Sequence, residues 1–159
     1  MNLYLMRHGE ALAETEDPIQ GLSAEGVRQV RASAGAMKRL GICPELVICS
    51  PKKRAKQTAA LVAEVVNYPY SDIVESEALL PKAAPEGFTE LLEKYRDRQN
   101  LLLVGHLPSL NTILSFLLGS ETAVRFESGG VCCIDSSNGE ARRGELRFCL
   151  TAEQMRLLA

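Results

Sequence analysis

Three short polar clusters in the sequence each follow an apolar run, and they contain residues suited to phosphoryl chemistry. Arg7 and His8 follow the first run, Arg54 follows the second after a short turn, and His106 follows another run late in the chain. A neutral imidazole is a competent nucleophile near neutral pH, because its unperturbed pKa is about 6.5. Guanidinium groups bind phosphoryl oxygens through paired hydrogen bonds. These residue types therefore indicate transfer of a phosphoryl group.

Each of these four side chains has a predicted role. His8, which lies between Arg7 and Gly9, is the expected nucleophile, and the neighbouring cations should disfavour its protonation. Arg7 and Arg54 are the expected phosphate clamp, since they can stabilise charge on the phosphoryl oxygens. His106 is expected to donate a hydrogen bond to the same group. The alternatives are a buried structural histidine at 8, a solvated helix residue at 54 and a helix-capping histidine at 106.

Glycines and lysines surround these residues. Gly9 and Gly105 are expected to let the backbone approach a bound ligand closely, which makes Gly9 a candidate for substrate binding. Arg54 lies among three lysines at the beginning of a predicted helix, where the helix dipole favours anions and disfavours cations. These lysines are Lys52, Lys53 and Lys56. They are either a rim for an anionic substrate or a solvated surface.

The hydrophobic pattern predicts strands that alternate with helices. Short apolar runs predict strands over 3–6, 46–49, 73–75, 101–104, 130–135 and 145–150. Helical spacing predicts helices over 23–40, with Ser23 as N-cap and Gly41 as stop, over 52–66, over 86–97 and from Pro108 onward. This alternation is typical of an α/β fold with a mainly parallel sheet.

We therefore expect residues 1–159 to form a single three-layer domain with helices on both faces of the sheet. The last two strands are expected to pair antiparallel at one edge, joined by the turn-rich segment 136–144. Ligands of such sheets bind outside the carboxyl ends of the strands. Because the three polar clusters follow three strands, they should converge on one crevice.

Composition limits the classes of partner. The 159 residues are 46% hydrophobic and 24% charged, and 18 basic against 20 acidic residues give a net charge of −2. This balance provides no global basic field for nucleic acid or anionic lipid. The apolar runs are also far too short to span a bilayer. Neither nucleic acid nor membrane is an expected partner, and the sequence makes no prediction about the oligomeric state.

Cysteine usage predicts a reducing environment and no metal. The five cysteines lie at 43, 49, 132, 133 and 149, without a C-x-x-C pair and far in sequence from either histidine. No zinc motif is therefore readable. Unpaired thiols and the lack of a leader pattern favour a cytoplasmic protein. Cys49, Cys132 and Cys133 are expected to be small buried hydrophobic residues rather than reactive thiols.

The polar clusters resemble those of the histidine phosphatase superfamily, which has the phosphoglycerate mutase-like fold. The matching pieces are Arg7-His8-Gly9-Glu10, Ser50-Pro51 with Arg54-Ala55 and Gln57-Thr58, and Gly105-His106. The short chain and Gly105-His106-Leu107-Pro108 are most similar to the small bacterial phosphohistidine phosphatases of the SixA type. The resemblance implies a phosphatase fold, a phosphohistidine intermediate on His8 and no metal or other cofactor.

Two segments depart from the pattern of that family. Many relatives carry an acid for the leaving group in the segment after the third predicted strand, Glu75 to Pro85, and Glu77 and Glu86 are the candidates here. The segment Asp17–Leu22 matches an Asp-x-x-Arg-Pro-Leu pattern, except that Gln20 and Gly21 replace Arg-Pro. The first departure leaves the leaving-group acid unassigned.

The leading hypothesis is a metal-independent phosphatase in which His8 attacks phosphorus and water then releases phosphate. The expected substrate is phosphohistidine on a signalling or phosphotransfer protein. The alternatives are a small-molecule phosphomonoesterase and a catalytically silent phosphate-binding module. A mutase is less favoured, because no long insertion can supply a lid that excludes water. An unrelated hydrolase is disfavoured, because the sequence has no G-x-S-x-G motif and indicates no proximity of a cysteine to a histidine.

Overall fold

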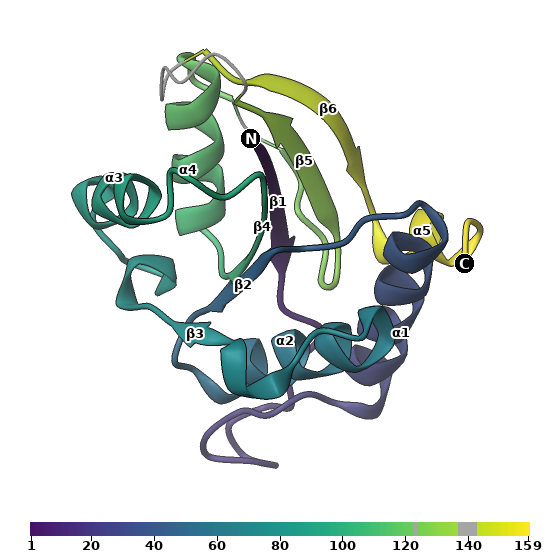
Figure 1. Ribbon diagram of the computed structural model, residues 1–159. Helices are drawn as coiled ribbons and strands as arrows, with labels where there is room; N and C mark the ends of the chain where they lie inside the picture. The colour runs from purple at the N-terminus through teal and green to yellow at the C-terminus, as the bar shows by residue number, and fades with distance from the viewer. Residues whose placement is uncertain (123, 137–142) are drawn as a thin grey trace.

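One six-stranded sheet forms the centre of the computed structural model, which describes residues 1–122, 124–136 and 143–159 (Figure 1). The strands are β1 (Asn2–Arg7), β2 (Leu46–Cys49), β3 (Val74–Glu75), β4 (Asn100–Gly105), β5 (Val131–Asp135) and β6 (Glu145–Leu150). Their order across the sheet is β3-β2-β4-β1-β5-β6. The first four are parallel, and β5 pairs antiparallel with both β1 and β6. The predicted mainly parallel sheet with an antiparallel late pair is confirmed.

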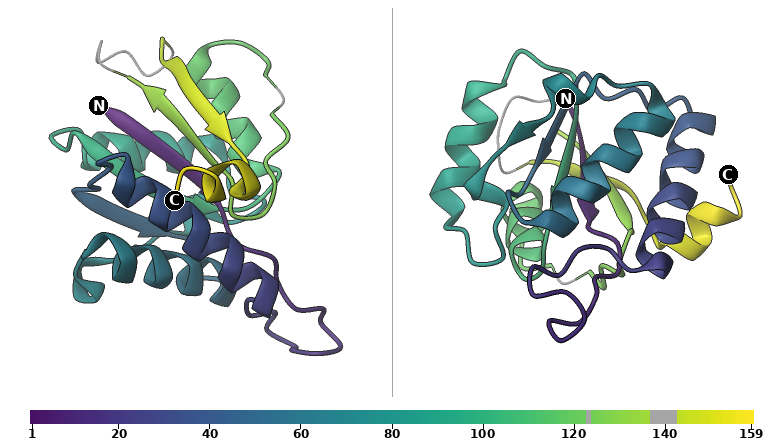
Figure 2. Two further views of the ribbon diagram at one scale, coloured as in Figure 1. Left: turned by 90° about the vertical axis from the view of Figure 1, so that its right-hand side faces the viewer. Right: turned by 90° about the horizontal axis from the view of Figure 1, so that it is seen from below.

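Helices cover both faces of this sheet, which confirms the predicted three layers (Figures 1 and 2). They are α1 (Ala24–Arg39), α2 (Lys53–Val66), α3 (Pro85–Lys94), α4 (Ser109–Leu118) and α5 (Ala152–Arg156), with 3₁₀ turns η1 (Tyr70–Asp72) and η2 (Glu77–Leu79). The helices α1, α2 and α5 pack on one face, and α3 and α4 pack on the other.

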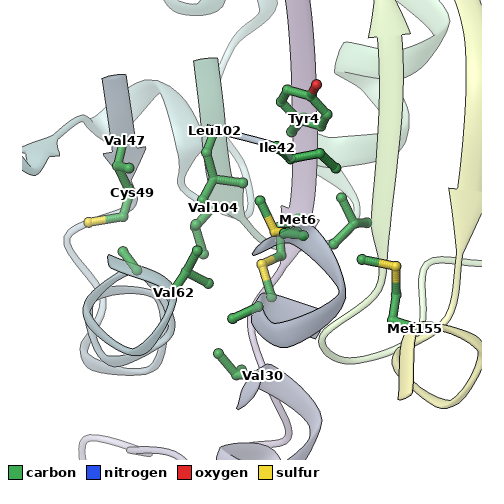
Figure 3. Close-up of a cluster of buried hydrophobic side chains, with 14 of the residues drawn as sticks. Tyr4, Met6, Val30, Ile42, Val47, Cys49, Val62, Leu102, Val104 and Met155 are labelled. Carbon is green, nitrogen blue, oxygen red and sulfur yellow. The ribbon is translucent and has the colours of Figure 1, made fainter. Parts of the chain in front are cut away.

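Two hydrophobic cores, one on each face, hold the layers together. Successive side chains of a strand point to opposite faces. Tyr4 and Met6 of β1 accordingly join the core under α1 and α2, and Leu3 and Leu5 join the core under α3 and α4. Figure 3 shows the first core, where Val62 of α2 lies beside Val104 of β4. Burial on both faces explains why these strands are continuous apolar runs.

The observed helix ends agree with the predicted ones for α1, α2 and the beginning of α4, whereas α3 ends earlier than predicted and α5 was not predicted. The Ser23 hydroxyl accepts a hydrogen bond from the Gly26 amide at 3.0 Å, which confirms it as the N-cap of α1. The helix α3 ends at Lys94 rather than at 97, because Tyr95 leaves helical geometry. The helix α5 was not predicted, although its Thr151-x-x-Gln154 capping box is a recognisable N-terminal signal.

The cysteines correct one expectation. Cys132 and Cys149, which lie opposite each other on β5 and β6, form a disulfide. The prediction of unpaired thiols is therefore wrong for these two, because strand register is not visible in sequence spacing. Cys43, Cys49 and Cys133 are free, and the last two are buried as expected.

Most of the predicted turn-rich connection before β6, residues 137–142, lies outside the described residues. Within the described ranges, none of the helices combines the length and the apolar character that crossing a membrane requires.

Candidate active site

The ends of three neighbouring strands bring the predicted polar residues together. His8 follows β1, Ser50 follows β2 and His106 follows β4, which lies between the other two strands. The His8 amide donates to the Gly105 carbonyl at 3.2 Å, and the Ser50 amide donates to the Val104 carbonyl at 3.0 Å. The centroids of the two imidazole rings are 4.9 Å apart. The polar residues that follow these three strands therefore lie together at the carboxyl ends, as expected.

The hydrogen bonds of His8 identify its reactive atom. Its Nδ1 lies 2.7 Å from the Gly9 carbonyl oxygen, which can only accept, so Nδ1 carries the proton. The lone pair is then on Nε2, to which the Arg54 Nε donates at 3.3 Å. This tautomer is assigned from the hydrogen-bond partners. It leaves Nε2 as the nucleophilic atom, beside the guanidinium that would bind the phosphoryl group.

Burial keeps both histidines neutral at neutral pH. The pKa of His8 is lowered to about 4, mainly by desolvation; the hydrogen bond to the Gly9 carbonyl raises it, and the charges of Arg54 and Arg7 lower it. The pKa of His106 is lowered to about 3, mainly by desolvation and then by the charges of His8 and Arg54. The expected influence of neighbouring cations is present, but burial is the larger cause.

Ser50 is a site residue to which the sequence assigned no role. Its buried hydroxyl lies 2.7 Å from His106 Nε2 and accepts a hydrogen bond from the Lys52 amide at 3.3 Å. A hydroxyl that accepts from an amide can donate its own proton to Nε2. His106 then carries its remaining proton on Nδ1.

Two buried nitrogens at the site have no hydrogen-bond partner in the described structure. One is Nδ1 of His106, and the other is Nε of Arg7, whose Nη1 donates to the Phe126 carbonyl at 2.8 Å. A buried donor without a partner costs about 1–3 kcal/mol. An anion bound between these side chains would satisfy both donors, so the arrangement favours binding of a phosphoryl group.

Thr58 connects the nucleophile segment to the arginine. Its buried hydroxyl accepts a hydrogen bond from the Gly9 amide at 3.1 Å and donates to the Arg54 carbonyl at 2.8 Å. Gly9 also accepts the proton of His8 Nδ1. Through two hydrogen bonds, Thr58 therefore fixes the relative position of His8 and Arg54.

We expect Thr58→Val, which removes the hydroxyl but keeps the side-chain shape, to lower kcat by about tenfold. Two net hydrogen bonds of about 1 kcal/mol each can account for this loss if they hold the reacting groups in place. Steady-state kinetics with p-nitrophenyl phosphate give kcat and KM separately, and Thr58→Ser is the control that should recover most of kcat. An equal loss of kcat in both variants, or a rise in KM with kcat unchanged, would contradict a positioning role.

Gly9 has a packing reason as well as a predicted ligand role. A Cβ atom at this position would lie 2.6 Å from the Gly26 carbonyl oxygen and 2.8 Å from Cγ2 of Val30. The start of α1 therefore approaches the backbone after β1 too closely for a side chain. The role of Gly9 in substrate binding stays a prediction.

The three lysines beside Arg54 differ in their surroundings. Lys53 Nζ lies 2.9 Å from a carboxylate oxygen of Asp17, and Lys56 Nζ lies 3.0 Å from one of Glu75. Lys52 is exposed and has no ion-pair partner within the described residues. Of the three, Lys52 is therefore the one available to a ligand without breaking an ion pair.

The segment in which the sequence departs from the family pattern is held against α2. Asp17 accepts the Gly21 amide at 2.8 Å in addition to Lys53, and Gln57 Oε1 accepts the Leu22 amide at 2.7 Å. A Cβ on Gly21 would lie 2.9 Å from Cε of Lys53 and 3.0 Å from the Asp17 carboxylate. Glycine at this position thus permits the close approach of the segment to α2.

Neither of the two candidate acids contacts the reacting groups. Glu77 lies in η2 and Glu86 in the first turn of α3, and both are exposed. Within the described residues, no hydrogen bond or ion pair joins either one to His8, Arg54 or His106. A role for either as an acid therefore stays a prediction, without support from contacts.

The low pKa of His8 predicts an unusual pH profile. The neutral form is the nucleophile, so a pKa of about 4 keeps it active as the pH falls through 6.5. The profile of kcat/KM reports the free enzyme. After correction for substrate titration, its acidic limb should have a midpoint near pH 4, measured where circular dichroism shows the protein to be folded. A midpoint near the unperturbed value of about 6.5 would contradict the account.

Comparison with known proteins supports this picture at the level of family and fold. The profile of the histidine phosphatase superfamily (branch 1) matches residues 3–80. Over 149 residues, the chain is 28% identical to phosphohistidine phosphatase SixA of Escherichia coli (strain K12), covering 87% of this chain and 89% of the relative.

Two solved structures illustrate the shared fold. A protein histidine phosphatase SixA complexed with tungstate superimposes with a TM-score of 0.86 at 24% identity, covering 96% of this chain and 97% of the other. A putative alpha-ribazole-5′-P phosphatase from Escherichia coli str. K-12 substr. MG1655 superimposes with a TM-score of 0.72 at 22% identity, covering 96% and 97%. The fold therefore occurs in enzymes named for different phosphorylated substrates.

Proposed function

Because this chain belongs to the histidine phosphatase superfamily and is a phosphatase, we propose that it hydrolyses phosphohistidine on a protein through a covalent intermediate on His8. Nε2 of His8 attacks phosphorus, so that a new P–N bond forms while the P–N bond of the substrate breaks. The leaving imidazole is neutral, because its other ring nitrogen takes a proton from solvent before this bond breaks. Water then attacks the phosphorus, the bond to Nε2 breaks, and inorganic phosphate leaves.

The hydrogen-bond donors of the site have distinct parts in this reaction. Arg54 lies beside Nε2 of His8, and Arg7 and His106 each offer an unpartnered buried nitrogen. Charge-assisted hydrogen bonds from guanidinium groups to phosphoryl oxygens contribute about 1.5–3 kcal/mol each. These groups stabilise the phosphoryl group without a metal, which is the basis for proposing metal-independent catalysis.

The observation that carries the choice of substrate is that no carboxylate contacts the reacting groups. Within the described residues, no Asp or Glu makes a hydrogen bond or ion pair with His8, Arg54 or His106. A phosphate ester expels an alkoxide, which needs a proton from a positioned acid. Phosphohistidine that solvent has protonated on its other ring nitrogen expels a neutral imidazole, and the conjugate acid of this leaving group has a pKa of only about 6.5. The site therefore favours P–N bonds.

Sequence similarity to phosphohistidine phosphatase SixA supports the same substrate class. The second candidate, a small-molecule phosphomonoesterase, is favoured by the fold shared with the alpha-ribazole-5′-P phosphatase. A signalling or phosphotransfer protein as the substrate, and a cytoplasmic location, stay predictions. The substrate classes can be separated in one set of assays.

We expect phosphohistidine peptide and p-nitrophenyl phosphate to be hydrolysed with kcat/KM at least about 100-fold above that of phosphoserine peptide. This margin follows from the 10²–10⁴-fold that general acid catalysis typically contributes. The three substrates are measured with wild type, Glu77→Gln and Glu86→Gln in the presence of a strong chelator. Glu77→Gln and Glu86→Gln should each have the same kcat/KM as wild type on all three substrates.

Other outcomes of these assays would change the assignment. Phosphoserine turnover equal to phosphohistidine turnover, with one variant losing only ester hydrolysis, would contradict the proposal and identify the acid. Activity that requires added zinc or magnesium would contradict the metal-independent mechanism. Failure to turn over any of the three substrates would favour the silent phosphate-binding module.

A further inference from the structure

Two grooves meet at Lys52, and Arg54 lines one of them. One, of about 730 Å³, lies between the segment 18–20 and the start of α2, and Arg54 lines it. The other, of about 380 Å³, lies between Lys52 and the segment 80–83. Because Lys52 lines both, the two grooves form one band along the rim of the site. We call this band the lysine rim, and its principal residues are Ile19, Lys52, Lys53, Lys56, Leu80 and Lys82.

The lysine rim carries positive charge that the protein does not fully neutralise. Lys53 and Lys56 have carboxylate partners, as described above. Lys52 and Lys82 are exposed and have no ion pair in the part of the chain that the structure describes. No described carboxylate residue lines either groove. Since the whole chain has a net charge of −2, this positive potential is local to one side of the active site.

The opposite side of the site is different. A groove of about 580 Å³ lies beside Arg7, and three further arginines line it. Each of those arginines has a glutamate partner, in the pairs Arg28–Glu25, Arg125–Glu127 and Arg156–Glu153, at 2.5, 3.8 and 2.7 Å. The two flanks of the catalytic centre therefore differ in net charge, and only the lysine rim should attract an acidic partner strongly.

The lysine rim also has apolar surface at both ends. Ile19 is 64% exposed, on the purple loop that projects from the molecule in Figure 2. Asp17 holds this loop to α2 through Lys53. Leu80 and Pro81 line the far groove. A small phosphorylated molecule held at Arg54 needs neither end, whereas an extended polypeptide that crosses the site can contact both.

From these features we propose that the lysine rim is a docking surface for an acidic segment of the protein substrate, next to the phosphohistidine. The inference rests on the proposed function and adds the charge of the partner. Carboxylates of the segment would face Lys52 and Lys82, while its apolar side chains would contact Ile19 and Leu80. Charge complementarity of this kind mainly sets orientation and the rate of association, and salt weakens it.

The test compares two phosphohistidine peptides of equal length, one with glutamates and one with lysines around the phosphohistidine. The readout is the ratio of their kcat/KM values within each enzyme, which cancels any effect of a substitution on the chemical step. Wild type should favour the glutamate peptide by at least about tenfold at low ionic strength, and the ratio should shrink at high salt. A wild-type ratio near one would overturn the proposal.

Matched charge reversals locate the effect. In the double variant Lys52→Glu/Lys82→Glu, the ratio of kcat/KM for the glutamate peptide to that for the lysine peptide should fall to about one or below. In the control double variant Lys38→Glu/Lys94→Glu, this ratio should equal that of wild type. Lys38 and Lys94 are exposed residues in the last turns of α1 and α3, outside the grooves of the lysine rim, and give the same change in net charge. An unchanged ratio in the first variant, or an equal loss in both, would overturn the docking surface.

Failure of the proposed function gives a different result from failure of the docking surface. If wild type hydrolyses p-nitrophenyl phosphate but neither phosphohistidine peptide, the substrate assignment is wrong. The same comparison with phosphotyrosine peptides that have the same flanks then tests the lysine rim. A ratio that depends on Lys52 and Lys82 there would support the surface for another phosphorylated residue, and a ratio near one would overturn it.

Discussion

His8→Ala is expected to lower turnover of every phosphorylated substrate by at least about 1,000-fold, because removal of a nucleophile ends covalent catalysis. His106 cannot readily replace it, since Nε2 of His106 is engaged by the Ser50 hydroxyl at 2.7 Å. The measurement is kcat/KM with phosphohistidine peptide and with p-nitrophenyl phosphate.

The control for this variant is binding of the product. Arg7, Arg54 and His106 remain in His8→Ala, so inorganic phosphate should still bind, and calorimetry can measure it. Retained phosphate binding with lost turnover separates loss of the nucleophile from loss of the site. More than about a tenth of the wild-type activity in this variant would contradict nucleophilic catalysis by His8.

Arg54→Ala is expected to lower kcat/KM by at least about tenfold, since about 1.4 kcal/mol of lost transition-state stabilisation gives that factor. Burial lowers the pKa of this guanidinium, and within the described residues it has no carboxylate partner. Its charge is therefore free to stabilise the phosphoryl group. Arg54→Lys should recover only part of the loss, because an ammonium group lacks the planar fork of the guanidinium.

The matched control is Lys53→Ala, which removes a cation from the adjacent position. Lys53 is paired with Asp17, so its loss should change kcat/KM for p-nitrophenyl phosphate by less than about twofold. Circular dichroism checks that each variant is folded. Small and equal effects of Arg54→Ala and Lys53→Ala on kcat/KM would indicate that Arg54 is a solvated helix residue without a role in catalysis.

The sequence predicted the layers of the fold because strand burial and helix periodicity are both local signals. The apolar run of β4 and the capped helix α1 each have a recognisable pattern over fewer than two dozen residues. The disulfide between Cys132 and Cys149 depends instead on the register of two strands. The short helix α5 was not predicted because its five residues span little more than one turn and so give no helical periodicity, although its capping box is present.

The site was predictable where the chemistry belongs to the residue type, as for His8 and Arg54. The position of these two residues relative to each other could not be predicted, because it depends on hydrogen bonds between segments that are distant in the sequence. Thr58 contacts the Gly9 amide, 49 positions away, and Ser50 contacts His106, 56 positions away. Both lie in pieces that match the family, but only the folded geometry shows which partners they bind.

The most direct test of the central claim is to identify the phosphorylated atom during turnover. Wild-type enzyme is mixed with phosphohistidine peptide, quenched in alkali on the millisecond scale and mapped by mass spectrometry. The account predicts one phosphoryl group on the peptide that contains His8, stable to base, lost in acid and absent from His8→Ala. A phosphoryl group on any other residue, or single-turnover hydrolysis without a phosphoenzyme at any time point, would contradict it.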